Sequence, residues 1–315
     1  MKVLVTGGAG FIGRWVVKEL LGRGDQVWVL DNLASGSETN LAEFRRHPFF
    51  KEFVIGDIKD TRLLTGLFRE GFAICFHLAA QINVQHSIDR PQEAFSNDVV
   101  GTFNLLEECR KNRTKMVFMS TCMVYDAARA DRAIDESWAV KPASPYSGAK
   151  LAGENLVLSY YHAYSLPAVI LRPFNTYGPY QKSSGEGGVI AVFIRRQLEG
   201  AALSIYGDGA QTRDFLFASD CARFIVGAGA SAEAGGLILN AGSGQDLTIN
   251  ELARLICDDG SRICHVPHIH PQSEIPKLQC DHTRARALLG WEPGISLRQG
   301  IALTEAWIRE QMANE

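Results

Sequence analysis

Short runs of hydrophobic residues alternate with amphipathic stretches through the first half of the chain. We predict buried strands from the runs that are almost entirely apolar: Lys2–Thr6, Gln26–Asp31, Phe53–Ile55, Ile74–Leu78, Met116–Ser120 and Ala168–Arg172. Helices are predicted between them, at Phe11–Arg23, Pro91–Arg110 and Tyr146–Tyr164. Strands without a polar face are typical of a parallel sheet covered by helices on both faces. The pattern therefore predicts a doubly wound α/β fold.

The pattern changes at about Asn175, where loops and short segments replace the regular alternation. A helix is predicted at Val189–Glu199, and Leu237–Asn240 is predicted to return to the main sheet as a strand. The stretch Thr248–Glu315 is expected to contain two or three helices and loops. We therefore predict a first domain at residues 1–174, joined again by 214–241, and a smaller discontinuous C-terminal domain at 175–213 and 242–315.

Composition and charge exclude several classes of protein. The 315 residues include 32 basic and 35 acidic side chains, so the net charge of −3 gives no electrostatic basis for binding nucleic acid. No apolar run approaches the roughly 20 residues that a membrane-spanning helix needs. The seven cysteines are odd in number and scattered, which favours free thiols in a reducing cytoplasm over a disulfide framework.

The segment from Gly7 to Gly13 lies between the first predicted strand and the first predicted helix. Its glycines at positions 7, 10 and 13 allow a tight turn and a close approach of the backbone to a pyrophosphate. The free N–H groups and positive dipole of the helix N-terminus favour the same anion. Asp31 ends the second predicted strand, where a carboxylate accepts hydrogen bonds from ribose hydroxyls. Together these features predict a Rossmann-type dinucleotide site.

Asp31 also bears on the choice of dinucleotide. A carboxylate at this place repels a 2′-phosphate, and no Arg or Lys lies between Asp31 and Arg45 to offset it. We therefore predict NAD rather than NADP. After the third predicted strand, Asp57 and Ile58 are candidates for contact with the adenine, although Asp57 taken alone is equally typical of a turn.

Tyr146 and Lys150 lie four residues apart at the start of a predicted helix, so their side chains share one face. A phenol titrates near 10, so a Tyr base near neutral pH needs its pKa lowered by roughly 3 units, about 4 kcal/mol. We expect the Lys150 ammonium and an oxidised nicotinamide to supply that shift. Thr121, at the carboxyl end of the fifth strand, is placed to orient a reacting oxygen.

A set of motifs resembles the extended short-chain dehydrogenase/reductase family, in its nucleotide-sugar epimerase/dehydratase branch, over essentially the whole chain. The motifs are Gly7–Gly13, His77-Leu78-Ala79-Ala80, Asn97–Thr102, Tyr146-x-x-x-Lys150, Arg172–Pro179, Gln211–Phe215 and Leu289-Gly290-Trp291-x-Pro293. The resemblance implies a bound NAD, an NDP-sugar substrate and oxidation of the sugar at C4. It also implies a homodimer, formed by pairing the helices predicted at Pro91–Arg110 and Tyr146–Tyr164.

The resemblance assigns the site residues one by one. Catalysis falls to Tyr146 as base, Lys150 as its partner and Thr121 as a hydrogen-bond donor to the C4 oxygen. The residues expected to bind NAD are Gly7, Gly10, Phe11, Ile12, Gly13, Asp31, Asn32, Asp57, Ile58, Leu78, Ala79, Ala80, Asn97, Ser120, Tyr146 and Lys150. The residues expected to bind the NDP-sugar are His86, Cys122, Met123, Asn175, Val189, Tyr206, Arg213 and Glu274.

The two residues after Thr121 depart from the dehydratase pattern. Dehydratases of this branch have Asp-Glu there and decarboxylases usually have Glu at the second position, but this chain has Cys122 and Met123. Met123 cannot titrate, whereas Cys122 is either a thiol acid or part of an apolar wall. A 4-epimerase needs no further acid or base, because the keto sugar only turns over and takes the hydride back. The sequence therefore favours a 4-epimerase.

Other interpretations stay open at this point. They are a 4,6- or 5,6-dehydratase that uses Cys122, an NDP-uronate decarboxylase, and a non-catalytic NAD-binding protein. His86 is a candidate for contact with the sugar, although a surface histidine is somewhat more typical. The run from Cys264 to His270 has no zinc-binding spacing, so we predict no metal site.

Overall fold

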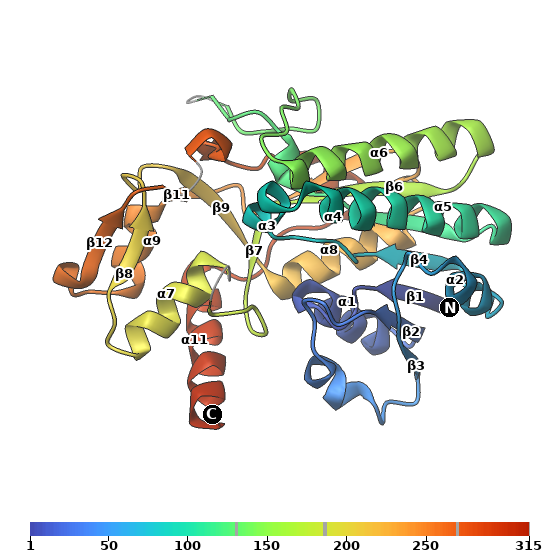
Figure 1. Ribbon diagram of the computed structural model, residues 1–315, viewed down its shortest axis with the longest axis horizontal. Helices are drawn as coiled ribbons and strands as arrows, with labels where there is room; N and C mark the ends of the chain where they lie inside the picture. Colours follow the sequence, from blue (N-terminus) through green and yellow to red (C-terminus); the bar gives the residue numbers. More distant parts are fainter. Residues whose placement is uncertain (130–131, 185–187, 269–270, 315) are drawn as a thin grey trace.

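The computed structural model describes residues 1–129, 132–184, 188–268 and 271–314. The chain forms a larger lobe and a smaller lobe, which lie side by side in Figure 1. Among the described residues, no helix combines the length and the hydrophobicity needed to cross a bilayer.

The larger lobe is built on a parallel sheet of seven strands in the order β10-β6-β5-β4-β1-β2-β3. These are β1 (Lys2–Thr6), β2 (Gln26–Asp31), β3 (Phe50–Ile55), β4 (Ile74–His77), β5 (Lys115–Met119), β6 (Ala168–Pro173) and β10 (Ile238–Ala241). The strand order reverses beside β1, and in such sheets this reversal opens a crevice at the carboxyl ends of the strands. The predicted doubly wound fold is confirmed.

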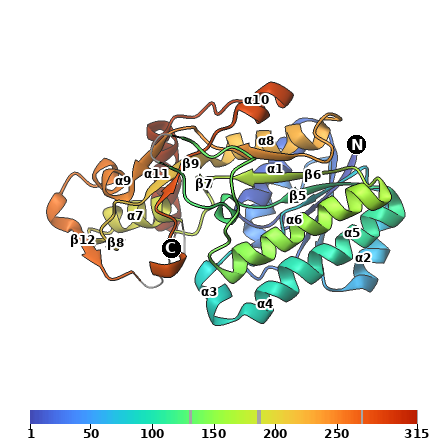
Figure 2. The same ribbon diagram turned by 90° about the horizontal axis from the view of Figure 1, so that it is seen from above.

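Helices cover both faces of this sheet (Figure 2). One face packs against α1 (Phe11–Gly22) and α8 (Ala218–Ala230), and the other against α2 (Thr61–Phe68), α5 (Gly101–Asn112) and α6 (Pro145–Tyr164). Successive residues of β1 alternate between the two cores: Val3 and Val5 face α1 and α8, whereas Leu4 faces the other layer. This double burial explains why the strands are apolar throughout.

The smaller lobe consists of two small sheets packed against three helices. Its strands are β7 (Asn175–Tyr177), β8 (Leu203–Tyr206), β9 (Thr212–Phe217), β11 (Asp246–Thr248), β12 (Ile263–Val266) and β13 (Lys277–Leu278), and its helices are α7 (Val189–Leu198), α9 (Ile249–Ile256) and α11 (Leu297–Asn314). The remaining short helices are α3 (Val84–Asp89), α4 (Pro91–Phe95), α10 (Thr283–Leu289), the 3-10 turns at Glu38–Phe44, Cys122–Val124, Gly260–Arg262 and Pro271–Ser273, and a π turn at Ser96–Val100.

Some differences between the structure and the predicted elements go beyond shifts of one residue at the end of an element. Strand β3 begins at Phe50, because it is an edge strand whose exposed Lys51 and Glu52 hide it from a search for apolar runs. The predicted helix at Pro91–Arg110 is divided by the π turn at Ser96–Val100. Thr102 Oγ1, at the start of α5, donates to the carbonyl oxygen of Asp98 in this turn at 2.6 Å. Residues 214–217, predicted with the first domain, lie in β9 of the smaller lobe.

Candidate active site

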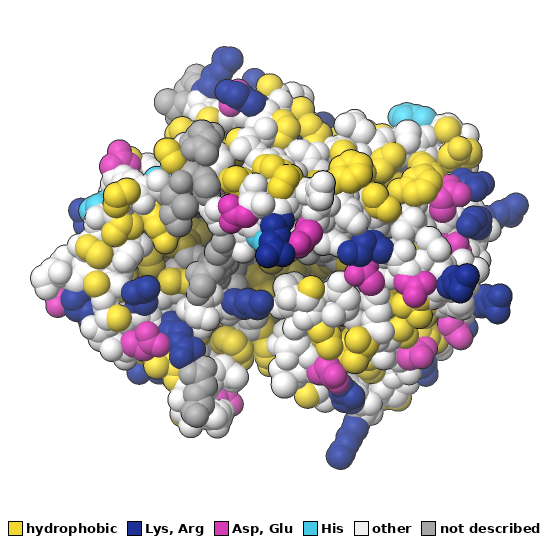
Figure 3. All heavy atoms as spheres, in the orientation of Figure 1, with side chains coloured by type: hydrophobic (Ala, Val, Ile, Leu, Met, Phe, Trp, Pro, Cys, Tyr) yellow, Lys and Arg dark blue, Asp and Glu magenta, His cyan; other side chains and the backbone are white. Residues whose placement is uncertain are grey.

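A cavity of about 710 Å³ lies at the carboxyl edge of the main sheet and extends to the smaller lobe. Figure 3 shows the corresponding hollow between the two lobes, with hydrophobic side chains inside it and charged side chains around its rim. One wall, which we call the main-sheet wall, comes from the loops that follow β1, β2, β3, β4 and β5. The opposite wall, the small-lobe wall, comes from residues 173–177, 181, 188–190, 193, 204–206, 211, 213 and 215, together with Ile249, His268 and Glu274.

Gly7 and Gly13, on either side of the turn from β1 into α1, have no space for a larger side chain. Gly7 adopts φ +73°, and a Cβ atom there would lie 2.6 Å from the backbone nitrogen of Ala79. A Cβ atom on Gly13 would overlap the carbonyl oxygen of Gly7. The helix begins at Phe11 with no side-chain cap on Gly10, so its first N–H groups stay available for an anion. This cradle fits the pyrophosphate of a dinucleotide.

Asp31 does more than the sequence predicted. Its Oδ2 accepts the backbone N–H of Ala9 at 2.9 Å and its Oδ1 accepts that of Leu33 at 2.8 Å. The carboxylate therefore also anchors the segment Gly7–Gly13, which we call the phosphate loop. Burial raises the pKa of Asp31, and these N–H groups oppose the rise. Each oxygen retains a lone pair for a ribose hydroxyl. Beside it, Asn32 donates to Asp57 Oδ2 at 3.0 Å.

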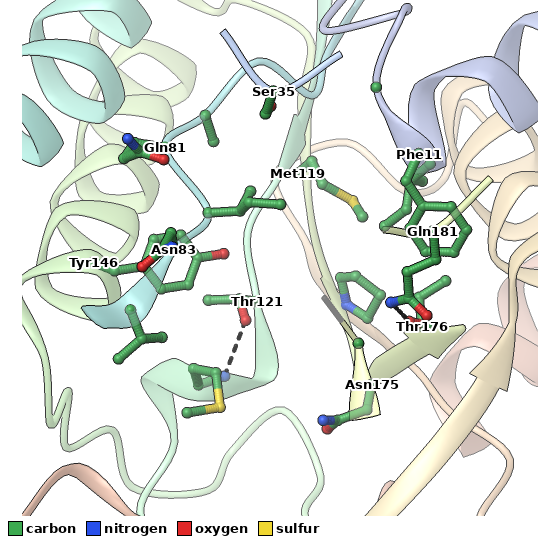
Figure 4. A pocket seen from close by; sticks show the side chains of 18 of the residues that line it. Phe11, Ser35, Gln81, Asn83, Met119, Thr121, Tyr146, Asn175, Thr176 and Gln181 are labelled. Atoms are coloured by element: carbon green, nitrogen blue, oxygen red, sulfur yellow. Dashed lines mark hydrogen bonds between the residues drawn. The ribbon is translucent and has the colours of Figure 1, made fainter. Parts of the chain in front are cut away.

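Helix α6 places Tyr146 and Lys150 at the centre of the cavity. Ser144 and Ser147 form a capping box at its start, and the N–H of Tyr146 donates to Ser87 Oγ at 3.1 Å. The Tyr146 hydroxyl points into the cavity, near Thr121 (Figure 4). Lys150 Nζ lies deeper and donates to the carbonyl oxygen of Met119 at 2.7 Å. Two catalytic candidates from one helix therefore face the same space.

The electrostatics around Tyr146 correct one expectation. Burial raises the pKa of the Tyr146 phenol well above its ordinary value, and the Asp98 carboxylate raises it further. Burial lowers the pKa of Lys150, which the charges of Asp98 and Glu154 oppose. The protein groups alone therefore do not produce the predicted phenolate. Of the two groups expected to lower the pKa of Tyr146, Lys150 and an oxidised nicotinamide, only the cationic nicotinamide remains.

Asp98 was not among the predicted site residues. Its side chain is buried in the π turn, where Oδ1 accepts the N–H of Gln81 at 2.7 Å, and Oδ2 has no hydrogen-bond partner among the described residues. Burial raises the pKa of Asp98 to about 6. Its sequence signal was its place inside the Asn97–Thr102 motif, from which only Asn97 was taken as a site residue.

The turn after β5 carries Thr121, Cys122 and Met123. Thr121 Oγ1 accepts the N–H of Met123 at 3.2 Å, which leaves its proton free for another acceptor. The Cys122 thiol is buried, 4.0 Å from Asn175 Oδ1, and burial raises its pKa to about 12. Cys122 is therefore a much weaker acid than an ordinary thiol.

The small-lobe wall carries the side chain of Arg213, whose guanidinium is held by several hydrogen bonds. Arg213 Nη1 donates to the carbonyl oxygens of Thr212 at 2.7 Å and Ile275 at 2.8 Å, and its Nη2 pairs with Glu274. Glu274 Oε2 also lies 2.7 Å from His268 Nε2. These bonds hold the guanidinium in one orientation, with N–H groups left for a phosphate.

The structure brings together all the predicted site residues except one. Those that line the cavity are Gly7, Gly10, Phe11, Ile12, Gly13, Asp31, Asn32, Asp57, Ile58, Leu78, Ala79, Ala80, Asn97, Ser120, Thr121, Cys122, Met123, Tyr146, Lys150, Asn175, Val189, Tyr206, Arg213 and Glu274. His86 does not line it: its ring lies 2.6 Å from Gln81 Nε2 and 3.3 Å from Glu93.

Several polar residues of the lining were not predicted: Gln81, Asn83, Thr176, Gln181, Gln211 and His268. Gln211 and Thr176 lie inside the predicted motifs Gln211–Phe215 and Arg172–Pro179, and Gln81 directly follows Leu78-Ala79-Ala80, so the motifs themselves held the signal for these three. The other three carry no such signal. No metal-binding cluster is found among the described residues, and Ile269 and His270 of the histidine-rich run lie outside them.

Comparisons with known proteins agree with this geometry. The model of the NAD dependent epimerase/dehydratase family matches residues 3–242. A UDP-glucose 4-epimerase of Mycolicibacterium smegmatis is 39% identical over 316 residues, which cover 99% of each chain. The crystal structure of Pal from Bacillus thuringiensis is 57% identical, with a TM-score of 0.97 over 99% of this chain and 100% of that one. DesIV, a dTDP-glucose 4,6-dehydratase from Streptomyces venezuelae solved with NAD and TYD bound, is 33% identical, with a TM-score of 0.93 over 99% of this chain and 98% of that one.

Proposed function

The chain belongs to the NAD dependent epimerase/dehydratase family, and from this premise we propose that it is a UDP-sugar 4-epimerase that acts through a transient 4-keto sugar. The substrate that we favour is a UDP-hexose or UDP-N-acetylhexosamine. The observation that carries the proposal is the Tyr146 hydroxyl, which points into the cavity beside Thr121 (Figure 4). Lys150, one helical turn further along α6, lines the same cavity.

In this proposal Tyr146 accepts the proton of the C4 hydroxyl as the C4 hydride departs. It returns the proton to the C4 oxygen when the hydride comes back on the opposite face of C4. Bound NAD supplies the hydride acceptor and the positive charge that favours the phenolate. Thr121 donates to the C4 oxygen, and Lys150 lies within the same buried pocket to stabilise the negative charge that develops.

The groups beside Thr121 favour epimerisation over dehydration. Elimination of water across C5 and C6 needs an acid and a base near those carbons. Cys122, with its pKa raised to about 12, is a poor acid, and Met123 has no proton to give or take. Epimerisation needs neither group, since Tyr146 handles the only proton that moves.

The two walls are proposed to bind different ligands, NAD on the main-sheet wall and the sugar nucleotide on the small-lobe wall. We propose that the phosphate loop and Asp31 hold NAD, with NAD preferred over NADP because Asp31 repels a 2′-phosphate. Arg213, oriented by Glu274, binds the diphosphate of the sugar nucleotide. The UDP preference rests on the UDP-glucose 4-epimerase relative.

We further propose a cytoplasmic homodimer that pairs the faces of α4, α5 and α6. Phe95, Val100, Phe103 and Tyr164 are exposed on these segments, and Figure 3 shows hydrophobic side chains gathered over this face. An isologous contact between two copies would bury them together. Sedimentation of the native protein and of Phe103→Asp tests this: we expect a dimer and a monomer, respectively.

The proposed activity is tested by product analysis with a panel of UDP- and dTDP-sugars. We expect an isomer of unchanged mass with C4 inverted in the NMR spectrum. A 6-deoxy-4-keto sugar or an alkene would instead show a dehydratase, and loss of CO₂ from a uronate a decarboxylase. Absence of any product across the panel would support a non-catalytic NAD-binding protein.

A further inference from the structure

Arg14 is a buried cation directly after the phosphate loop. It is only 1% exposed, although it lies one residue beyond Gly13 on α1. Its guanidinium carbon lies 3.6 Å from the centre of the Tyr180 ring, its Nε donates to the carbonyl oxygen of Asn40 at 3.1 Å, and its Nη2 pairs with Glu43. A cation stacked at this distance on an aromatic face and removed from water makes a strong, directional contact.

Tyr180 lies between the two lobes and has an unfavourable backbone. Its φ of +72° belongs to the left-handed region, which a side chain this large adopts only where its surroundings hold it. Its ring contacts Arg14 of the larger lobe and Trp307 of α11, whose ring centre is 5.0 Å from that of Tyr180; Trp15 of α1 adds an edge-to-face contact at 6.4 Å. In Figure 1 the loop after β7 lies between α1 and α11.

Further hydrogen bonds join this stack to both ligand walls. Asn40, which accepts from Arg14, donates its Nδ2 to the carbonyl oxygen of Ala9 in the phosphate loop at 2.8 Å. Trp15 Nε1 donates to the carbonyl oxygen of Pro179 at 3.2 Å. The residue after Tyr180 is Gln181, which lines the cavity and donates to the carbonyl oxygen of Thr176 at 3.1 Å.

We propose that Arg14, Tyr180 and Trp307 form an interdomain clasp that positions the Thr176–Gln181 part of the small-lobe wall against the phosphate loop. The three are positioning residues: none of them lines the cavity, and they act on the ligand through Gln181 and Thr176. The inference rests on the proposed function for the identity of the ligand, a nucleoside diphosphate. The clasp is expected to increase the affinity for this ligand and to have no effect on the binding of NAD.

Tyr180→Gly tests the clasp, because glycine keeps the positive φ without strain but removes the ring. We expect the variant to fold and to retain its NAD, with the Kd for UDP or dTDP raised at least tenfold and the KM raised more than kcat is lowered. Tyr180→Phe, which keeps the stack on Arg14 and Trp307, is expected to restore both values to within about twofold. Calorimetric titration with UDP and with dTDP, the NAD content and circular dichroism are the readouts.

Two further variants separate the clasp from a general loss of stability. Trp307→Leu removes the ring that packs on Tyr180 from α11. We expect this variant to weaken UDP binding about threefold. It tests the clasp if Tyr180→Gly does not fold. Lys18→Ala is the matched control: Lys18 is exposed on α1 and lies 5.5 Å from the Trp15 ring, outside the clasp, so binding should not change.

The outcomes distinguish this inference from the proposed function. A native protein that binds neither UDP nor dTDP overturns the proposed function and the clasp with it. A native protein that binds a nucleotide, together with a folded Tyr180→Gly or Trp307→Leu variant that binds it equally well, overturns the clasp alone. Loss of NAD from folded Tyr180→Gly also contradicts the clasp, because the effect would then lie in the phosphate loop.

Discussion

The main-sheet wall of the cavity comes from segments that each follow a strand, whereas the small-lobe wall is assembled from distant parts of the chain. Gly7–Gly13, Asp31 and Leu78 stand directly after β1, at the end of β2 and after β4. On the other side, Arg213 and Glu274 meet across 61 positions of sequence. The residues of the main-sheet wall are therefore positioned by the strands that precede them, and those of the small-lobe wall by tertiary contacts. The proposed function depends on both, since in it a dinucleotide and a sugar nucleotide meet at Tyr146.

The largest expected effect comes from Tyr146→Phe, which removes the group on which both walls converge. We expect turnover to fall about 10³-fold, within the range for loss of a general base, while NAD stays bound. Turnover with the UDP-sugar and the absorbance of released cofactor measure the two quantities. A folded variant that has lost its NAD, or one that turns over at the native rate, would contradict the role given to the hydroxyl.

Gly13→Ala affects the main-sheet wall alone. The added methyl group overlaps the carbonyl oxygen of Gly7, so we expect NAD affinity to fall about 100-fold through overpacking of the turn. Gly22→Ala, at the other end of α1, is the control, because a Cβ atom there meets nothing within 4 Å. That variant should keep NAD and melt at the same temperature or slightly higher. Equal NAD content in both variants would show that the turn is not the cradle.

Arg213→Met affects the small-lobe wall alone. Loss of charge-assisted hydrogen bonds to a diphosphate is expected to weaken UDP binding about 30-fold and to leave NAD in place. Arg309→Met serves as control, because Arg309 is exposed on α11 and pairs only with Glu305 among the described residues. If UDP affinity falls equally in both variants, the effect is one of net charge and not of the site.

The smallest expected effect concerns Asp98, which is buried near the main-sheet wall but does not line the cavity. Its folded pKa of about 6 lies above the unfolded value, so the charged carboxylate costs folding free energy above pH 6 and this cost fades as the pH falls toward 4. Asp98→Asn keeps an acceptor for the Gln81 N–H and removes the charge. We expect the variant to be more stable than the native protein at pH 8, by about 1 kcal/mol more than at pH 5. Urea unfolding at both pH values measures this, and a difference independent of pH would contradict it.

The sequence predicts the parallel sheet and about half of the residues that line the cavity. The glycine turn, Asp31 and the Tyr146–Lys150 pair were found because strand, turn and helix signals lie close together there. The residues of the small-lobe wall were assigned from family motifs, and their pairing, such as Glu274 with Arg213, has no local signal. The burial of individual side chains could not be predicted from the sequence either. The raised pKa of Tyr146 and the unpaired Oδ2 of Asp98 among the described residues both result from burial in the folded protein. His86, assigned by motif position, instead contacts Gln81 and Glu93.

The fate of a deuterium label at C4 tests most directly whether Tyr146 works on a C4 hydroxyl. A UDP-hexose with deuterium on C4 is incubated with the enzyme in ordinary water, and the product is analysed by NMR and mass spectrometry. The account predicts the C4 epimer with the deuterium still on C4, because the hydride leaves and returns within one bound complex. Exchange of the label with solvent hydrogen, or its transfer to C6 of a deoxy sugar, would contradict the account.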